Sequence, residues 1–249
     1  MQNKLTAVIP AAGMSRRLKS LTENTHKSLL EVNGKPLLLR ILKSLKASGI
    51  SNVVIVTGFC SEKIKSSVAE WNLGIEVDFV HNPDYQTTNN MYSLFLARPF
   101  LKNSGMLLLD SDILFDERII SLLLESGESN VIALRESPNL SEEEIKVIID
   151  SSGNVKEINK TVNPSEAIGE SIGIELFDMN ATNALFEIMD HHINSLNQLN
   201  DYYEVAFEKS ILKGLQIKPI AVGDLICMEM DTPEDFEIAN ELAKKIDKT

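Results

Sequence analysis

Cysteine is scarce in this 249-residue chain, and long apolar segments are absent from it. Cys60 and Cys227 stand far apart and lack the close pairing of a metal-binding or redox motif. The first residues include polar Gln2, Asn3 and Lys4 rather than a long apolar run, so neither secretion nor disulfide bonds are expected. No apolar run is long enough to span a bilayer. We therefore expect a cytoplasmic protein without a membrane partner.

Positive charge is also in short supply. The chain has 24 Lys and Arg against 36 Asp and Glu, a formal net charge of −12. Such a charge repels nucleic acid backbones and acidic membranes, so no nucleic acid partner is expected. The segment 1–50 is the exception, because its nine basic and two acidic residues give it +7 and leave −19 for the remainder. Attraction for anions is therefore predicted to be local.

The segment 6–36 combines an apolar strand, a turn of small residues and three cations. In chain order these are Ala7–Ile9, then Ala11, Ala12 and Gly13, then Arg16, Arg17 and Lys27. Small residues leave backbone N–H groups uncovered, so that they can converge on phosphate oxygens while the cations neutralise the remaining charge. Lys43 and Lys46, in contrast, have the pattern of solvated lysines on a first helix. We interpret the segment as a phosphate-binding loop at the end of a first strand.

Strand-like and helix-like segments alternate through the first half of the chain. Apolar runs that predict strands lie at Ala7–Pro10, Val53–Thr57, Val77–Val80, Met106–Leu109 and Val131–Leu134. Amphipathic segments that predict helices lie at Pro36–Ser48, Ser61–Glu70, Met91–Leu101 and Glu117–Glu125. This alternation predicts an α/β fold with a largely parallel, helix-covered sheet. No linker divides the chain, so we expect a single domain, 1–249.

After Leu134 the pattern changes to a hairpin and a mixed tail. The hairpin is predicted from Ile145–Ile149 and Val155–Ile158, with turn residues between them. The later elements are a strand at Ile172–Phe177, helices at Asn180–Ile193 and Tyr202–Leu212, strands at Ile217–Val222 and Ile226–Met230, and a helix from Pro233 capped by Thr232 and Asp235.

Aspartates follow two of the predicted strands. Asp110 and Asp112 come directly after Met106–Leu109, and Asp231 follows Ile226–Met230. Ligands of open α/β sheets sit beyond the carboxyl ends of strands, and carboxylate oxygens suit a divalent metal. The alternatives are a solvated turn for the pair and a helix cap for Asp231. The combination with the basic loop favours a metal site.

Four segments resemble the nucleotidyltransferases, which join a nucleoside triphosphate to a phosphorylated small molecule and release pyrophosphate. They are AAGMSRRL, TENTHKSLLEVNGKPLL, LLLDSDILF and EMDTPEDF. The resemblance implies a Rossmann-like three-layer fold with a mixed, mostly parallel sheet and a small β-hairpin acceptor subregion. It also implies Mg²⁺ as the cofactor, bound by Asp112 and Asp231, and catalytic roles for Arg17 and Lys27. Asp112 is preferred to Asp110 because it matches the second residue of the family's Gly-Asp pair.

The segments DYQTTNNMYSLFLA, IGESIGIELF and DYYEVAFEK are similar to small cytidylyltransferases that act on phosphocholine or 2-aminoethylphosphonate. This likeness implies CTP as the nucleotide. Two departures from the family's pattern are Ser15, where many members have a second Gly, and His26, where Pro usually precedes the Lys. The residues expected at the nucleotide are Ala11, Ala12, Gly13, Met14, Ser15, Arg16, Arg17, Lys27, Thr88, Asn89 and Asp110. Those expected at the acceptor are Tyr92, Lys146, Lys160, Glu170, Tyr203 and Glu204.

The reaction needs no general base, because a phosphate nucleophile is already ionised at neutral pH. His191 and His192 are accordingly interpreted as surface residues. Three alternatives to the cytidylyltransferase remain: a sugar-1-phosphate nucleotidylyltransferase that uses UTP or dTTP, a GT-A type glycosyltransferase, and an inactive nucleotide-sensing module. The sequence leaves both a monomer and a homo-oligomer open.

Overall fold

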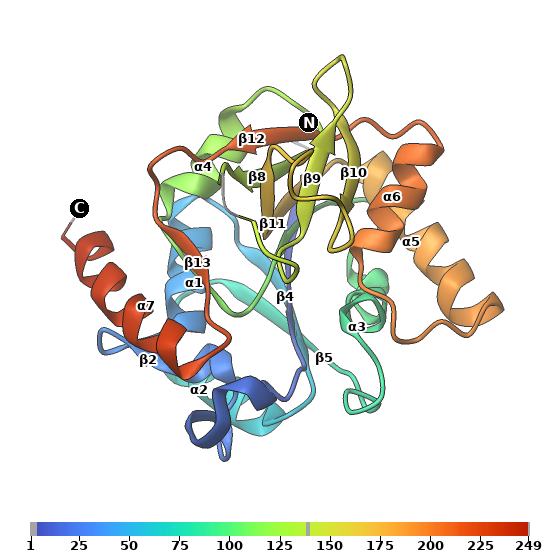
Figure 1. Cartoon of the computed structure of the whole chain (residues 1–249). Helices are drawn as coiled ribbons and strands as arrows, with labels where there is room; N and C mark the ends of the chain where they lie inside the picture. The colour runs from blue at the N-terminus through green and yellow to red at the C-terminus, as the bar shows by residue number, and fades with distance from the viewer. Residues whose placement is uncertain (1–3, 138–139, 249) are drawn as a thin grey trace.

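A mixed nine-stranded sheet runs through the part of the chain that the computed structural model describes, residues 4–137 and 140–248 (Figure 1). Its strands are β1 (Leu5–Ala11), β4 (Asn52–Thr57), β5 (Glu76–His81), β6 (Gly105–Leu109), β8 (Val131–Arg135), β9 (Lys146–Ile149), β10 (Val155–Asn159), β11 (Gly169–Phe177) and β12 (Lys218–Ala221). The main order is β10-β9-β11-β6-β1-β4-β5, while β8 pairs with β11 and β12. The strands β6, β1, β4 and β5 are parallel neighbours, and β11 runs antiparallel to β6, β8 and β9. The predicted α/β fold with a mixed sheet is confirmed.

Helices cover both faces of this sheet and complete three layers. They are α1 (Leu37–Ala47), α2 (Ser61–Trp71), α3 (Asn90–Leu96), α4 (Arg118–Glu125), α5 (Met179–Asp190) and α6 (Glu204–Leu212). A seventh helix, α7 (Pro233–Ile246), packs instead against Glu31–Val32 and the 3-10 helix Arg16–Thr22. Neighbouring residues of a strand point to opposite faces, so Ala7 and Ile9 pack in the core beneath α1 and α4, whereas Val8 packs in the core beneath α3, α5 and α6. Figure 1 shows α5 and α6 on the opposite side of the molecule from α1 and α7.

A short ladder between distant parts of the chain brings two acidic segments together. β7 (Ile113–Phe115) pairs with β13 (Cys227–Glu229) in an antiparallel register that sets Glu229 opposite Ile113. The Met230 N–H extends this ladder by donating to the carbonyl oxygen of Asp112 at 2.9 Å. The sequence pattern predicted β13 but not the three-residue β7.

The hairpin and the carboxyl-terminal cap agree with the sequence-based prediction. β9 and β10 are antiparallel, and the Asp150 side chain accepts from the backbone of Ser152 and Asn154 in the turn. Thr232 accepts a hydrogen bond from the Asp235 N–H, and Asp235 accepts one from the Thr232 N–H, which forms the predicted capping box of α7. A smaller hairpin, β2 (Glu31–Val32) with β3 (Lys35–Pro36), was not predicted.

Several predicted helix bounds were wrong. α3 ends at Leu96, and a separate 3-10 turn follows at Arg98–Phe100. α5 ends at Asp190 and continues as one π-helical turn, His191–Ser195. His192 in this turn is not a surface residue: it is buried, and its Nδ1 lies 2.9 Å from Asp201 Oδ2. Among the described residues, no helix has the length and apolarity needed to cross a bilayer.

Candidate active site

A cavity of about 270 Å³ opens beyond the carboxyl ends of β1 and β6. It lies at the edge of the sheet where parallel α/β folds hold ligands. Its walls come from the loop after β1, the segment before α3, the end of β6, the hairpin region and β13. The predicted site residues that line it are Ala12, Gly13, Arg17, Lys27, Thr88, Asn89, Asp110, Asp112, Lys160, Glu204 and Asp231.

The loop after β1 turns sharply at Ser15, which adopts left-handed backbone angles with φ of 51°. Its carbonyl oxygen accepts from the Leu18 N–H at 3.1 Å and from the Thr22 hydroxyl at 3.0 Å, which begins the 3-10 turn Arg16–Thr22. Gly13 is exposed, and a Cβ at its position would meet no atom within 4 Å. Backbone at Ala12 and Gly13 therefore borders the cavity. Four residues expected at the nucleotide are absent from the cavity lining: Ala11, Met14, Ser15 and Arg16.

Lys27 lies between the two carboxylates expected to bind metal. Its Nζ donates to Asp112 Oδ2 and lies 3.3 Å from Asp231 Oδ1. Arg17 Nη2 contacts the other oxygen of Asp231 at 2.7 Å. Burial alone would lower the pKa of Lys27, but the Asp112 and Asp231 carboxylates outweigh burial and raise it. Lys27 is therefore charged at neutral pH, and it reaches the site through a 3-10 turn, Lys27–Leu29.

His26, one of the departures from the family's pattern, caps this turn. Its Nδ1 accepts from the Ser28 N–H at 3.2 Å. Burial, followed by the charge of Lys27, lowers the pKa of His26 to about 3, so the ring is neutral near pH 7. His26 thus takes a structural position under Lys27 that adds no charge to the cavity.

Asp110 faces the cavity but is tied to the core behind it. The Tyr203 hydroxyl donates to Asp110 Oδ2 at 2.9 Å, and the Asp110 N–H donates to the Gly173 carbonyl at 2.9 Å. Burial, followed by the nearby charges of Asp112 and Glu175, raises the pKa of Asp110 well above its usual range. Tyr203 itself is 1% exposed and does not line the cavity, so its expected contact with the acceptor does not fit this structure.

Asn89 and Asn90 hold the backbone of the segment before α6. Asn89 Nδ2 donates to the Asn200 carbonyl at 3.2 Å, and Asn90 Oδ1 accepts from the Tyr203 N–H at 3.0 Å. The Asn89 N–H also donates to the Leu199 carbonyl at 3.0 Å. These contacts close one wall of the cavity, and they occupy hydrogen-bonding groups of Asn89 and Asn90 that a nucleotide could otherwise use.

Two residues expected at the acceptor lie elsewhere. Lys146 is 1% exposed, and its Nζ donates to backbone carbonyls of the preceding loop, so it cannot contact an acceptor here. Tyr92 packs against the apolar core beneath α3 and is absent from the cavity lining. Both residues differ from expectation for the same reason. The sequence pattern indicates on which face of a strand or helix a residue lies, but it does not indicate which other segments pack against that face.

Glu204 and Lys160 remain as residues of the acceptor side. Glu204 is 7% exposed, and its Oε2 has no hydrogen-bond partner among the described residues. Burial raises the pKa of Glu204 to about 7. Lys160 Nζ lies 5.4 Å from the centre of the Tyr202 ring, which also lines the cavity.

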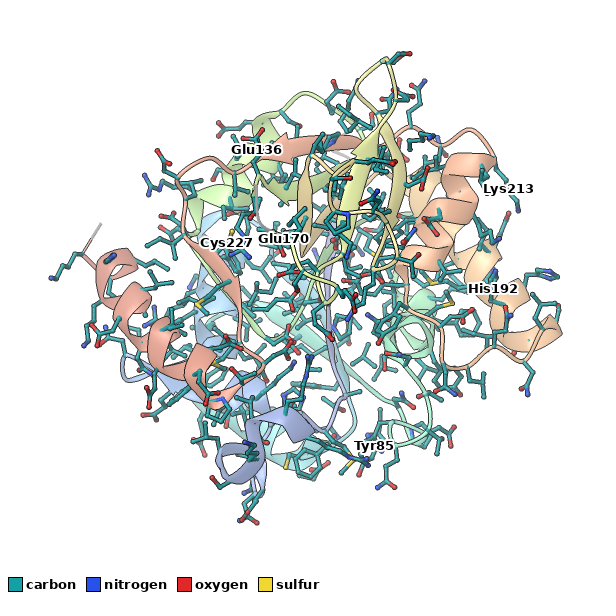
Figure 2. The ribbon with its side chains drawn as sticks, viewed as in Figure 1. Tyr85, Glu136, Glu170, His192, Lys213 and Cys227 are labelled. Atoms are coloured by element: carbon teal, nitrogen blue, oxygen red, sulfur yellow. The ribbon has the colours of Figure 1, made fainter. Side chains whose placement is uncertain are left out.

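Glu170 borders a second cavity, of about 340 Å³, which shares Arg17, Lys160 and Asp231 with the first. Arg135 holds Glu170 through its Nε at 2.7 Å, and Arg135 Nη1 donates to the Cys227 carbonyl at 3.2 Å. Figure 2 shows Glu170 beside Cys227, in keeping with this contact.

Two further residues that line the first cavity, Glu143 and Glu229, were not predicted from the sequence. Glu229 has a usable signal, because it stands two residues before Asp231 and a strand repeats its faces every two residues. Desolvation, followed by Asp112 and Asp231, raises the pKa of Glu229 to about 8, although part of its side chain is exposed to the cavity. Glu143 stands in an acidic run without periodicity, so no pattern selects it.

The α/β fold carries a small-residue loop, two strand-end aspartates and two nearby cations. Together these features are typical of the nucleotidyltransferases. The chain belongs to the family described as MobA-like NTP transferase domain, which matches residues 7–143.

Two curated relatives extend this comparison. The chain is 30% identical over 96% of its length to a bifunctional IPC transferase and DIPP synthase of Aquifex aeolicus, and covers 52% of that protein. It is 34% identical over 46% of its length to a choline-phosphate cytidylyltransferase of Haemophilus influenzae, and covers 47% of that protein. The chain thus spans about half the length of these relatives.

A solved structure of a CTP:phosphocholine cytidylyltransferase from Streptococcus pneumoniae matches with a TM-score of 0.78 at 22% identity. The match covers 96% of this chain and 99% of that chain. At this identity, the structural match establishes the shared nucleotidyltransferase fold.

Proposed function

We propose that the protein transfers CMP from CTP to a small phosphate or phosphonate acceptor that carries an amine or a quaternary ammonium group, with release of pyrophosphate. The observation that carries the proposal is the position of Lys27 between Asp112 and Asp231, with Arg17 on the outer oxygen of Asp231. This arrangement brings two cations and two carboxylates together beside the small-residue loop, which supports the proposal.

The carboxylates fit a Mg²⁺ cofactor. Asp112 and Asp231 already converge on one cation, the ammonium of Lys27, so their oxygens can face a common positive charge. No group of three or more His, Cys, Asp or Glu suited to a metal occurs among the described residues. Two carboxylates are enough, since Mg²⁺ in such enzymes completes its shell with water and substrate phosphates. When bound, the ion would draw charge from the reacting phosphate oxygens.

The chain's own residues then have to bring two anions together. The Ala12 and Gly13 backbone and the cations of Arg17 and Lys27 hold the triphosphate, so that the acceptor oxygen meets the α-phosphorus opposite the leaving pyrophosphate. Electrostatic positioning of this kind supplies most of the rate in phosphoryl transfer. The acceptor oxygen is already ionised, so no residue has to remove a proton from it.

The acceptor end of the cavity favours a positive group. Glu204 has an unpaired, buried carboxyl oxygen, and the Tyr202 ring stands on the same wall. A carboxylate beside an aromatic ring attracts an ammonium group more than a neutral hydroxyl. The names of the choline-phosphate relative and of the phosphocholine structure support the same acceptor class.

The test is a substrate panel in which pyrophosphate release is followed with Mg²⁺. CTP with phosphocholine or 2-aminoethylphosphonate should outpace UTP or dTTP with glucose-1-phosphate. The Asp112→Asn variant, run in parallel, identifies background hydrolysis. Faster turnover of the sugar phosphate would instead support the sugar-1-phosphate nucleotidylyltransferase, and transfer of a sugar from a nucleotide sugar would support the glycosyltransferase.

A further inference from the structure

Side chains of alternating charge form a row in the cavity, in the order Asp112, Lys27, Asp231 and Arg17. The carboxylate of Glu143 extends this row beyond Arg17. Glu143 Oε2 lies 3.8 Å from Arg17 Nη1 and 3.5 Å from Lys160 Nζ. Arg17 belongs to the loop after β1, whereas Lys160 follows β10, so Glu143 joins cations from two separate walls of the cavity.

We propose that Lys160 and the Nη1 group of Arg17 together form the subsite for the acceptor's phosphate or phosphonate, while the Nη2 group of Arg17 faces Asp231 and the triphosphate. Glu143 fills this subsite in the ligand-free protein and leaves it when the anion arrives. The identity of the anion rests on the proposed function. The Glu143 carboxylate lies where an anionic oxygen can contact both Arg17 and Lys160. Its position therefore locates the subsite better than the position of either cation alone.

Glu143 is suited to displacement. Its side chain is 75% exposed, so it can turn into water without losing buried contacts. Both of its distances exceed those of a direct hydrogen bond, and exposed ion pairs of this kind contribute little. A dianionic phosphate that donates no protons and offers three oxygens makes stronger charge-assisted contacts with the same two cations.

Lys146 keeps the backbone of Glu143 in place. Its buried Nζ donates to the carbonyls of Ser141 at 2.9 Å and Glu144 at 3.2 Å, which lie on either side of Glu143, and it lies 3.5 Å from the carbonyl of Glu142. The loop is thus anchored from beneath. Rotation of the Glu143 side chain is then sufficient to open the subsite, and no movement of the loop is needed.

Displacement has a thermodynamic signature. A carboxylate that leaves the subsite imposes the same cost on every anion that replaces it, whatever the charge of that anion. A carboxylate that stays and repels the ligand would penalise a dianion more than a monoanion. The two cases are distinguished by comparing phosphate, which is mainly dianionic at pH 8, with a weaker anion of lower charge such as formate.

The experiment measures the affinity of the full chain for inorganic phosphate and for formate at pH 8 and low ionic strength, without nucleotide or metal, by isothermal titration calorimetry. Glu143→Gln should tighten both by about the same factor, roughly threefold to tenfold for two weak ion pairs. Glu142→Gln, on the same loop, is the matched control and should change neither. Unchanged affinities in Glu143→Gln, a gain confined to phosphate, or no phosphate binding by any variant would each contradict the proposal.

A double-mutant cycle adds a second test. In a Lys160→Met background the gain from Glu143→Gln should shrink, because only the Arg17 contact remains to be released. An undiminished gain would show that Glu143 acts elsewhere. These measurements need no turnover, so an inactive enzyme that shows the predicted affinities would contradict the proposed function alone. An active cytidylyltransferase without them would contradict this inference alone.

Discussion

The backbone of Met230 is bound to the backbone of Asp112: the Met230 N–H donates to the Asp112 carbonyl at 2.9 Å. This contact continues the ladder between β7 and β13. It fixes the spacing between Asp112 and Asp231, the residue after Met230, before any ligand is bound. The geometry of the candidate metal site is therefore set by main-chain pairing, and side chains can be exchanged without disturbing it.

Asp112→Asn and Asp231→Asn should each abolish most of the activity. The amide keeps the shape of the side chain but removes a charged ligand, so kcat should fall by about 100-fold or more. The measurement is pyrophosphate release over a range of Mg²⁺ concentrations. Asp224→Asn, an exposed change of the same type, should retain the parent rate. Near-normal turnover by either site variant would remove its residue from the metal site.

Lys27→Met should lower kcat/KM by an amount that corresponds to about 2–4 kcal/mol of lost transition-state stabilisation. This is the size expected when one preorganised electrostatic contact is removed. The reason is that the cation between Asp112 and Asp231 also faces the place assigned to the triphosphate. Steady-state kinetics with varied CTP measure the change. Lys43→Met, on the exposed face of α1, is the matched control. Equal kinetics in the two variants would show that Lys27 only pairs with the aspartates.

At pH 8, above the raised pKa of Glu204, Glu204→Gln should raise KM for a cationic acceptor and leave KM for CTP nearly unchanged, because only the acceptor loses its counter-charge. An exposed ion pair contributes up to about 1 kcal/mol and a hydrogen bond to a charged group about 1.5–3 kcal/mol, so a rise of about fivefold to hundredfold is expected for this buried carboxylate. The same variant assayed with a neutral polyol phosphate provides the internal control. A parallel rise for the neutral acceptor would indicate a general distortion of the cavity.

The same glutamate predicts how stability depends on pH. Burial raises the pKa of Glu204 to about 7 from an ordinary value near 4.5, so the folded chain holds a proton there that the unfolded chain releases. The contribution of this proton to the free energy of unfolding is thus fully present below about pH 4.5 and is lost as pH rises through about 7. Urea unfolding should therefore find Glu204→Gln more stable than the parent at pH 8, by about 1–3 kcal/mol, with a smaller difference at pH 5.

For this comparison, Glu187→Gln provides the control, since Glu187 is exposed on α5. It should follow the parent at both pH values. If the advantage of Glu204→Gln were larger at pH 5 than at pH 8, the inferred direction of the pKa shift would be wrong.

Gly173→Ala should destabilise the fold and move Asp110. Gly173 has φ of +70°, and a Cβ there would lie 2.6 Å from Asp110 Oδ2. Gly214→Ala separates the two effects, because Gly214 has φ of +98° but no atom within 4 Å of the added Cβ. Backbone strain alone costs about 1–3 kcal/mol. Denaturant unfolding should show a larger loss for Gly173→Ala, and a loss no greater than that of Gly214→Ala would argue against the close contact.

Sequence patterns predicted the sheet well because apolar alternation and strand-end polarity are local. The segments that became β1, β4, β5, β6 and β8 were found within two residues of their observed bounds. Strand-end polarity also indicated one common site for the basic loop, Asp112 and Asp231, and the family resemblance added Lys27. These side chains do meet, although Asp231 follows β13, which pairs antiparallel with β7 outside the nine-stranded sheet. The roles of these residues remain predictions, but their convergence is now a feature of the structure.

Other features depend on tertiary partners and could not be predicted in this way. Lys146 is buried because three backbone carbonyls of an acidic loop approach its ammonium, and no spacing in the sequence encodes that approach. Tyr203 was expected at the acceptor, but its hydroxyl is bound to Asp110. Asn89 was expected at the nucleotide, but its side-chain amide donates to the Asn200 carbonyl. In each case a polar group that pattern analysis assigned to a ligand satisfies the protein itself.

The ladder between β7 and β13 also makes the candidate site depend on a contact between distant parts of the chain. Arg17, Lys27 and Asp112 lie in the first half of the chain, where β1 pairs with both β4 and β6 without any later segment. Asp231 joins these residues only when β13 pairs with β7. A partly folded chain in which this ladder has not formed therefore has its cations and one carboxylate, but lacks the second carboxylate of the candidate metal site.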